Sequence, residues 1–284
     1  MENKQQTDAG GDSDPPELDH TAMRHAPDNG ADSGVSGGGE GQSSSQPEFR
    51  LKAQPQPQPL FMIPTAMIWL AGILVLVHVV RLNAPGDLYY RTVAQFAFLP
   101  ARFVLPPSSD AFDLAVWITP VSHAFLHADW GHLAVNCFWM VAFATPVLRR
   151  LGTVRFLAMF AGASASGALF YFLLGNPYAA LPMVGASGAV SGFMGAAARF
   201  ALANIAPGQT DRVHLGRRMS LAETFTDRST LTFIAGFAVV NAVAGAGLIT
   251  PDGAGGIAWQ AHVGGFAFGL IAFSAFDPMR RAVP

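Results

Sequence analysis

The stretch Gly185-Ala186-Ser187-Gly188 places a hydroxyl group between glycines, inside a run from Ala179 to Ala198 that carries no charge. Polar groups in an apolar membrane segment are costly and usually functional, so Ser187 is a candidate nucleophile. A serine becomes a good nucleophile when a general base takes its proton, and histidine is the usual base. His262 is the only ionisable residue between positions 257 and 276, so we predict that it pairs with Ser187.

Attack by a serine creates an oxyanion, which needs hydrogen-bond donors held in place. His132 and Asn136 are four residues apart, so on a helix they share a face and can both donate from their side chains. The backbone N–H of Ser187 is a third candidate donor, because the first N–H groups of a helix lack partners within it. Gly185 would keep the approach to the serine open.

The composition is that of a helical membrane protein. The 284 residues are 51% hydrophobic and 13% charged, about half the charged fraction of an ordinary soluble domain. The net charge of -2 gives no reason to expect nucleic acid as a partner. The single cysteine, Cys137, excludes an internal disulfide and a thiolate metal cluster. We therefore predict an all-α polytopic membrane protein, with no cofactor and no metal.

The chain divides into three parts. Residues 1–59 are rich in Gly, Ser, Asp, Gln and Pro, which predicts a disordered tail. Residues 60–276 predict a six-helix membrane domain, and residues 277–284 a short C-terminal tail. Residues 81–116 mix aromatic and charged side chains, which is typical of an amphipathic loop in the headgroup region. The predicted membrane spans are 60–80, 120–148, 156–174, 185–203, 230–249 and 257–276.

Arginines orient these spans, because they gather on the cytoplasmic side of membrane proteins. They follow the second, fourth and sixth spans, whereas the loops 175–183 and 250–256 contain none. We therefore expect both termini in the cytoplasm. Twelve helical residues separate Ser187 from Arg199, or about 18 Å, which puts the serine roughly 10 Å below the outer face. The same reasoning puts His262, His132 and Asn136 near that level.

Small residues explain how the fourth and sixth spans could meet. Gly188 and Gly192 on one span, and Gly265 and Gly269 on the other, have the small-xxx-small spacing that lets membrane helices come close. We expect this contact to bring His262 to the serine.

These residues together resemble the rhomboid family of intramembrane serine proteases. Gly185-Ala186-Ser187-Gly188 matches the family's GxSG motif, and Ala261-His262-Val263-Gly264-Gly265 with Gly269 matches AHxxGxxxG. The second span matches the pattern HxxxHxxxxHxxxN through His123, His127, His132 and Asn136. The resemblance covers residues 60–276. Two departures affect packing: Ile257 stands where the fuller pattern has Gly, and a Trp-Arg pair in the first loop is missing.

The resemblance implies a Ser187–His262 dyad without a third carboxylate, and an oxyanion site at His132, Asn136 and the Ser187 N–H. It implies that the protein cleaves transmembrane segments of other membrane proteins, single-pass substrates included, near the outer face of the bilayer. Six spans with a short C-terminus suit a bacterial inner membrane, with the active site opening to the periplasm. We expect the substrate to come in laterally between the second and fifth spans, under a flexible cap at 250–256.

Two other classes of function stay open. His123 and His127 are four residues apart with His132 beyond them, like a zinc-binding face, which would suit a histidine-based metal transporter. However, Ala124 follows His123 where an HExxH metalloprotease has Glu. The other alternative is a non-catalytic relative that binds membrane clients. Such relatives typically lack the serine or the histidine, and both are present here.

Overall fold

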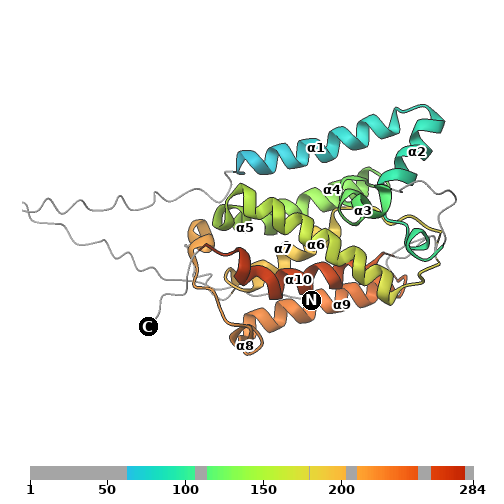
Figure 1. The fold of residues 1–284 in the computed structure, drawn as a ribbon. Coiled ribbons are helices and arrows are strands. Elements are labelled where there is room, and N and C mark those ends of the chain that lie inside the picture. The colour runs from blue at the N-terminus through green and yellow to red at the C-terminus, as the bar shows by residue number, and fades with distance from the viewer. Residues whose placement is uncertain (1–62, 106–113, 179, 203–209, 249–256, 279–284) are drawn as a thin grey trace, which may run out of the picture. The chain divides into compact units, whose positions relative to one another are not determined.

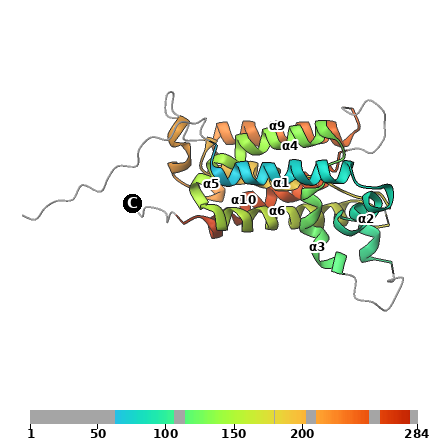
Figure 2. The ribbon, with the colours of Figure 1, turned by 90° about the horizontal axis from the view of Figure 1, so that it is seen from above.

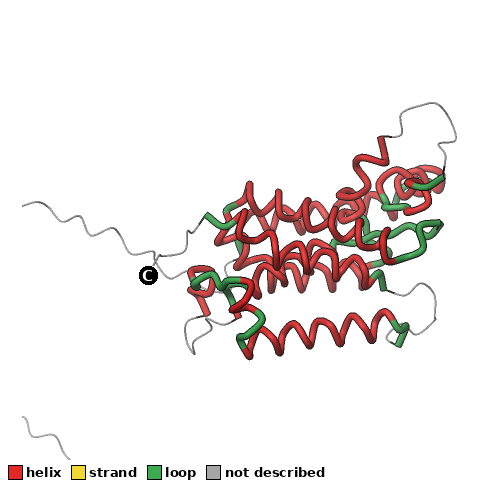
Figure 3. Tube along the Cα trace, turned by 60° about the horizontal axis from the view of Figure 1, so that its bottom comes forward, coloured by secondary structure: helices red, strands yellow, loops and turns green. Residues whose placement is uncertain are grey.

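The structure is a computed structural model of the chain. Every regular element in its described part is a helix (Figure 3). One isolated bridge joins Phe98 to Met183. The expected tail 1–59 and the expected cap 250–256 lie outside the described residues. The described residues are 63–105, 114–178, 180–202, 210–248 and 257–278.

The longer helices run side by side, as Figures 1 and 2 show for α1, α4, α6, α9 and α10. Short 3-10 turns lie at η1 (Pro100–Phe103), η2 (His123–Phe125) and η5 (Thr210–Leu215), and a π-helical turn at η3 (Met140–Ala144). The α-helices in chain order are α1 (Thr65–Leu82), α2 (Gly86–Phe96), α3 (Leu114–Ser122), α4 (Trp130–Trp139), α5 (Thr145–Leu151), α6 (Thr153–Leu174), α7 (Ser187–Ala198), α8 (Leu221–Thr224), α9 (Arg228–Gly245) and α10 (Trp259–Phe276).

Four stretches of helix are long and apolar enough to cross a membrane: Thr65–Leu82, Trp130–Leu151, Thr153–Leu174 and Arg228–Gly245. They correspond to the first, second, third and fifth expected spans, so the predicted all-α membrane protein is confirmed. Helix α10 coincides with the expected sixth span. Helix α7 covers 12 residues of the expected fourth, fewer than the ~20 that cross a bilayer. The count of six spans and the amphipathic first loop, which holds α2 and η1, stay predictions.

The second span begins later than expected, and the predicted start at Pro120 is wrong. Pro120 lies inside α3, and α4 begins only at Trp130. Asp129 starts α4 as its N-cap, because its carboxylate accepts a hydrogen bond of 2.8 Å from the His132 N–H. That hydrogen bond lowers the pKa of the Asp129 carboxyl from its ordinary value. His123 therefore lies on η2, before the helix that carries His132.

Helix α7 is the centre of the described fold, lying among α4, α6 and α10 (Figure 1). Ten of its twelve residues are buried, and most of these are Gly or Ala. Phe193 stacks on Phe156 of α6 with ring centroids 4.5 Å apart. A central helix of small residues lets its neighbours approach closely, so the residues at its first turn are surrounded by several elements.

Buried arginines join the helices at the far end of α7. Arg150 of α5 forms a two-point ion pair with Asp277, through Nε to Oδ1 at 3.0 Å and Nη2 to Oδ2 at 2.9 Å. Arg199, just after α7, donates to the carbonyl oxygens of Met219 and Leu270. Asp277, the first residue of the expected tail 277–284, is thus part of the packed structure. A buried charge without its partner is costly, so this network fixes how the helix ends meet.

Candidate active site

Ser187 is the first residue of α7, and the turn before it depends on Gly185. This glycine has φ of +120°, a backbone conformation that residues with a side chain rarely adopt. Its N–H donates to the His123 carbonyl at 3.0 Å, and the Ala186 N–H donates to His127 Nε2 at 3.4 Å. Both histidines are buried. Through these two hydrogen bonds they fix the backbone immediately before Ser187.

His132 and Asn136 lie against the same turn. A side-chain carbon added at Gly185 would lie 2.7 Å from two atoms of the His132 ring, Cε1 and Nε2, and 3.8 Å from Asn136 Nδ2. Asn136 is buried and uses one N–H to donate to the His132 carbonyl at 2.9 Å. The structure thus brings these three residues together beside Ser187, and only a glycine at position 185 leaves room for the imidazole.

The glycines of α7 and α10 face one another. A carbon added at Gly265 would overlap the Gly188 carbonyl oxygen, and one added at Gly269 would overlap that of Gly192. The two backbones therefore approach with no side chain between them. Ile257 lies before α10 begins and is exposed, so it takes no part in this contact.

His262 lies in the first turn of α10, next to this contact. The carbonyl oxygen of the preceding Ala261 would lie 3.5 Å from a carbon added at Gly188, the residue after the serine. The imidazole and the Ser187 side chain are both half-buried. The hydrogen bonds of the described residues include none between Ser187 and His262. Catalytic hydrogen bonds are often long in free enzymes and shorten when substrate binds.

The imidazole of His262 has a partner that sequence reasoning missed. Its Nδ1 lies 2.7 Å from Oδ1 of Asn241 on α9. Asn241 is the only amide side chain in the expected fifth span, 230–249, and polar residues inside membrane helices are usually functional. That signal was present in the sequence, but it did not indicate which helix Asn241 would meet.

The histidines of the proposed zinc-binding face do not form one. His123 Nε2 donates to the Ser164 carbonyl at 3.4 Å. The rings of His127 and His132 are 5.2 Å apart. Within the part of the chain that the structure describes, no group of three or more His, Cys, Asp or Glu side chains is arranged to hold a metal ion.

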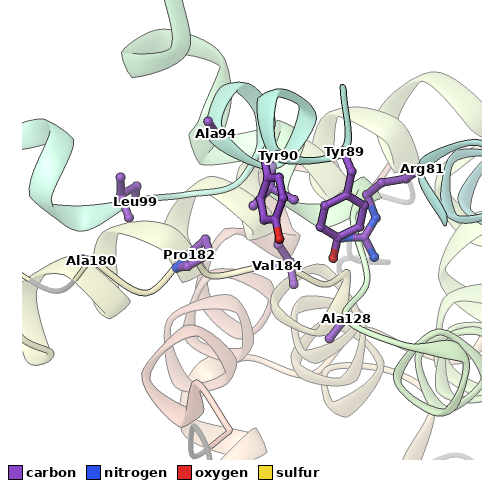
Figure 4. A pocket seen from close by; sticks show the side chains of 10 residues that line it. Arg81, Tyr89, Tyr90, Ala94, Leu99, Ala128, Ala180, Pro182 and Val184 are labelled. Atoms are coloured by element: carbon purple, nitrogen blue, oxygen red, sulfur yellow. The ribbon is translucent and has the colours of Figure 1, made fainter. Parts of the chain in front are cut away.

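A cavity of about 530 Å³ lies between the end of α1, helix α2 and the chain leading to Gly185. Figure 4 shows Tyr90 reaching from α2 to Val184, three residues before the serine, with Tyr89 beside it against Arg81. Arg81 stacks over the Tyr89 ring, with 5.1 Å to its centroid, and donates to the His127 carbonyl. The cavity is therefore joined to the Ser187 turn through His127.

The fold and the site define a helical membrane protein with a serine at the start of a central helix and a histidine on the helix packed against it. The sequence pattern of the Rhomboid domain matches residues 115–276, more than half of the chain, so the chain belongs to the rhomboid family. The expected family is confirmed. The chain is also similar to rhomboid protease GluP of Bacillus subtilis (strain 168), with 37% identity over 87 residues. These residues are 31% of this chain and 16% of GluP, so the match spans about a sixth of that relative.

Proposed function

We propose that this protein is an intramembrane serine endopeptidase that cleaves transmembrane segments of other membrane proteins. The observation that carries the proposal is the grouping of His132 and Asn136 against Gly185, two residues before Ser187. Helix α7, which Ser187 begins, is also packed glycine to glycine against α10, which bears His262. Membership of the rhomboid family supports it.

In the proposed reaction the Ser187 hydroxyl attacks the scissile carbonyl while His262 Nε2 takes its proton. The negative oxygen that forms is stabilised by the Ser187 N–H and by donors on His132 and Asn136. Asn136 has one amide N–H left after its bond to the His132 carbonyl. His262 then protonates the leaving amine, and water hydrolyses the acyl-enzyme.

We propose that the substrate helix comes in laterally between α4 and α9 and unwinds at the site, because helical carbonyls are already hydrogen-bonded. Helix α9 supports this route, since only Thr230, Asn241 and Ala244 of its eighteen residues are buried. Elements with little burial open at least cost. Residues next to the scissile bond would lie in the 530 Å³ cavity. Ala128→Trp, which narrows that cavity, should then raise KM and leave labelling of Ser187 by a small fluorophosphonate unchanged.

The function is tested by release of fragments from a single-span reporter in proteoliposomes. Ser187→Ala and His262→Ala should each lower the rate by about 10⁴-fold or more. Ser191→Ala is the matched control, because Ser191 is a buried serine one turn further along α7 and should stay near wild-type activity. Release of fragments at the wild-type rate by both Ser187→Ala and His262→Ala would refute the proposal.

We further propose that both termini are cytoplasmic, that the site opens to the outer side, and that the membrane is a bacterial inner membrane. The arginines after the second, fourth and sixth expected spans support this orientation. Single cysteines placed at position 177 and at position 216, in a variant with Cys137 replaced, should react with an impermeant thiol reagent from opposite sides. Labelling of both from the same side would contradict the topology.

A further inference from the structure

Asn241 is a buried amide in the C-terminal part of an apolar helix, with 6% of its surface exposed. A buried polar group without hydrogen bonds is costly, so both ends of this side chain need partners. Its Nδ2 donates to the Phe237 carbonyl at 2.8 Å, one turn earlier in α9. Its Oδ1 lies 2.7 Å from His262 Nδ1. Because the Phe237 carbonyl can only accept, the amide nitrogen must face it, and Oδ1 is left for the imidazole.

This arrangement determines where the proton of His262 sits. Oδ1 of Asn241 can only accept, so Nδ1 of His262 must be the nitrogen that carries hydrogen. A neutral imidazole has one N–H, so its Nε2, on the opposite edge of the ring, has a free lone pair. A general base needs an unprotonated ring nitrogen, so Nε2 is the nitrogen left to take the Ser187 proton in the proposed reaction.

We propose that Asn241 is a positioning residue that orients His262 and fixes its Nδ1–H tautomer, so that the site works through Ser187, His262 and Asn241. This rests on the proposed endopeptidase function. An amide suits the position, because it strengthens its bond to the imidazolium that forms during the reaction without burying a second charge. A carboxylate there would carry the cost of ionisation in an apolar helix whenever the imidazole is neutral.

The test compares three variants of the full chain in proteoliposomes. Asn241→Leu removes the acceptor at similar size, and Asn241→Asp keeps an acceptor. Thr232→Val removes a hydroxyl of α9 that donates to the Arg228 carbonyl of the same helix. We expect Asn241→Leu to lower kcat and the rate of fluorophosphonate labelling by about 10- to 100-fold with KM little changed, the usual cost of losing a partner that orients a functional histidine. Asn241→Asp should recover part of the loss, and Thr232→Val should match the wild type.

A second measurement reads the tautomer itself, by ¹⁵N NMR of the histidine rings, with His262 assigned through His262→Gln. The wild type should show Nδ1–H at His262, and Asn241→Leu should move the population toward Nε2–H. An Nε2–H tautomer in the wild type overturns the proposal. This measurement does not use Asn241→Leu, so it remains a test even if that variant does not fold. Wild-type labelling by a folded Asn241→Leu, or a rise in KM alone, also overturns it. Because the tautomer is read without substrate, its outcome is separate from that of the Ser187→Ala cleavage test.

Discussion

Gly185→Ala tests the backbone turn before Ser187 and the proposed oxyanion site together. The φ of +120° makes any side chain there strained, at about 1–3 kcal/mol of folding stability. The added carbon would also lie 2.7 Å from the His132 ring, whereas ordinary contacts begin at 3.4 Å, so the ring must shift by about 0.7 Å. Loss of one oxyanion donor lowers kcat by about 10² to 10³-fold. We expect a kcat loss in or just below that range, with KM less affected.

Two matched controls separate the causes in this experiment. Gly152→Ala has a positive φ of +73° but open space around the added carbon, so it reports backbone strain alone. Gly72→Ala lies in the interior of α1 with nothing near the added carbon and should be neutral or slightly stabilising. Each variant is measured by reporter cleavage and by thermal unfolding in detergent. If Gly185→Ala loses stability as Gly152→Ala does but cleaves at the wild-type rate, then the His132 ring is no part of the oxyanion site.

Three further predictions concern packing, the buried ion pair and pH. Gly269→Ala places a carbon against the Gly192 carbonyl, so α7 and α10 must separate, at about 1–3 kcal/mol in denaturant titration. Asp277→Ala leaves Arg150 buried without its carboxylate and should cost about 3–5 kcal/mol in the same assay. Hydrogen bonds from the backbone and side chain of Ser220, the N-cap of α8, lower the pKa of Glu223 to about 2. Its contribution to stability is therefore complete above its unfolded pKa of about 4.3 and is lost as pH falls through about 2, which hydrogen exchange of α8 measures.

Each of these predictions has a control within the chain. Gly236→Ala, in open space on α9, should leave stability nearly unchanged where Gly269→Ala lowers it. Asp277 also pairs with Arg218 at 3.3 Å. Replacing both residues of the closer pair, as Arg150→Met with Asp277→Leu, should recover part of the loss caused by Asp277→Ala. Glu223→Gln should remove the acid dependence of α8 exchange. An unchanged unfolding midpoint in Gly269→Ala or Asp277→Ala, or the same acid dependence in Glu223→Gln, would contradict the corresponding contact.

Hydropathy along the chain determined the class of protein and most of the helix positions. The expected third span ended at Leu174 and the expected sixth at Phe276, where α6 and α10 end. The start of the second span was wrong, because the expected span ran straight through residues 120–129, whereas the turn η2 interrupts the helix there and the Asp129 cap sets where α4 begins. A cap is a hydrogen bond between one side chain and the nearby backbone. Hydropathy averaged over many residues does not detect it.

The sequence alone also singled out Ser187 and His262 as candidates, because a serine between glycines and the only ionisable residue of the expected sixth span fit the roles of nucleophile and base. It gave each residue a depth, since rise per residue is a property of one helix. Lateral neighbours depend instead on how helix surfaces fit together. Only the tertiary structure therefore placed the His132 ring against Gly185, stacked Gly265 over Gly188, and joined Asn241 of α9 to the imidazole of His262.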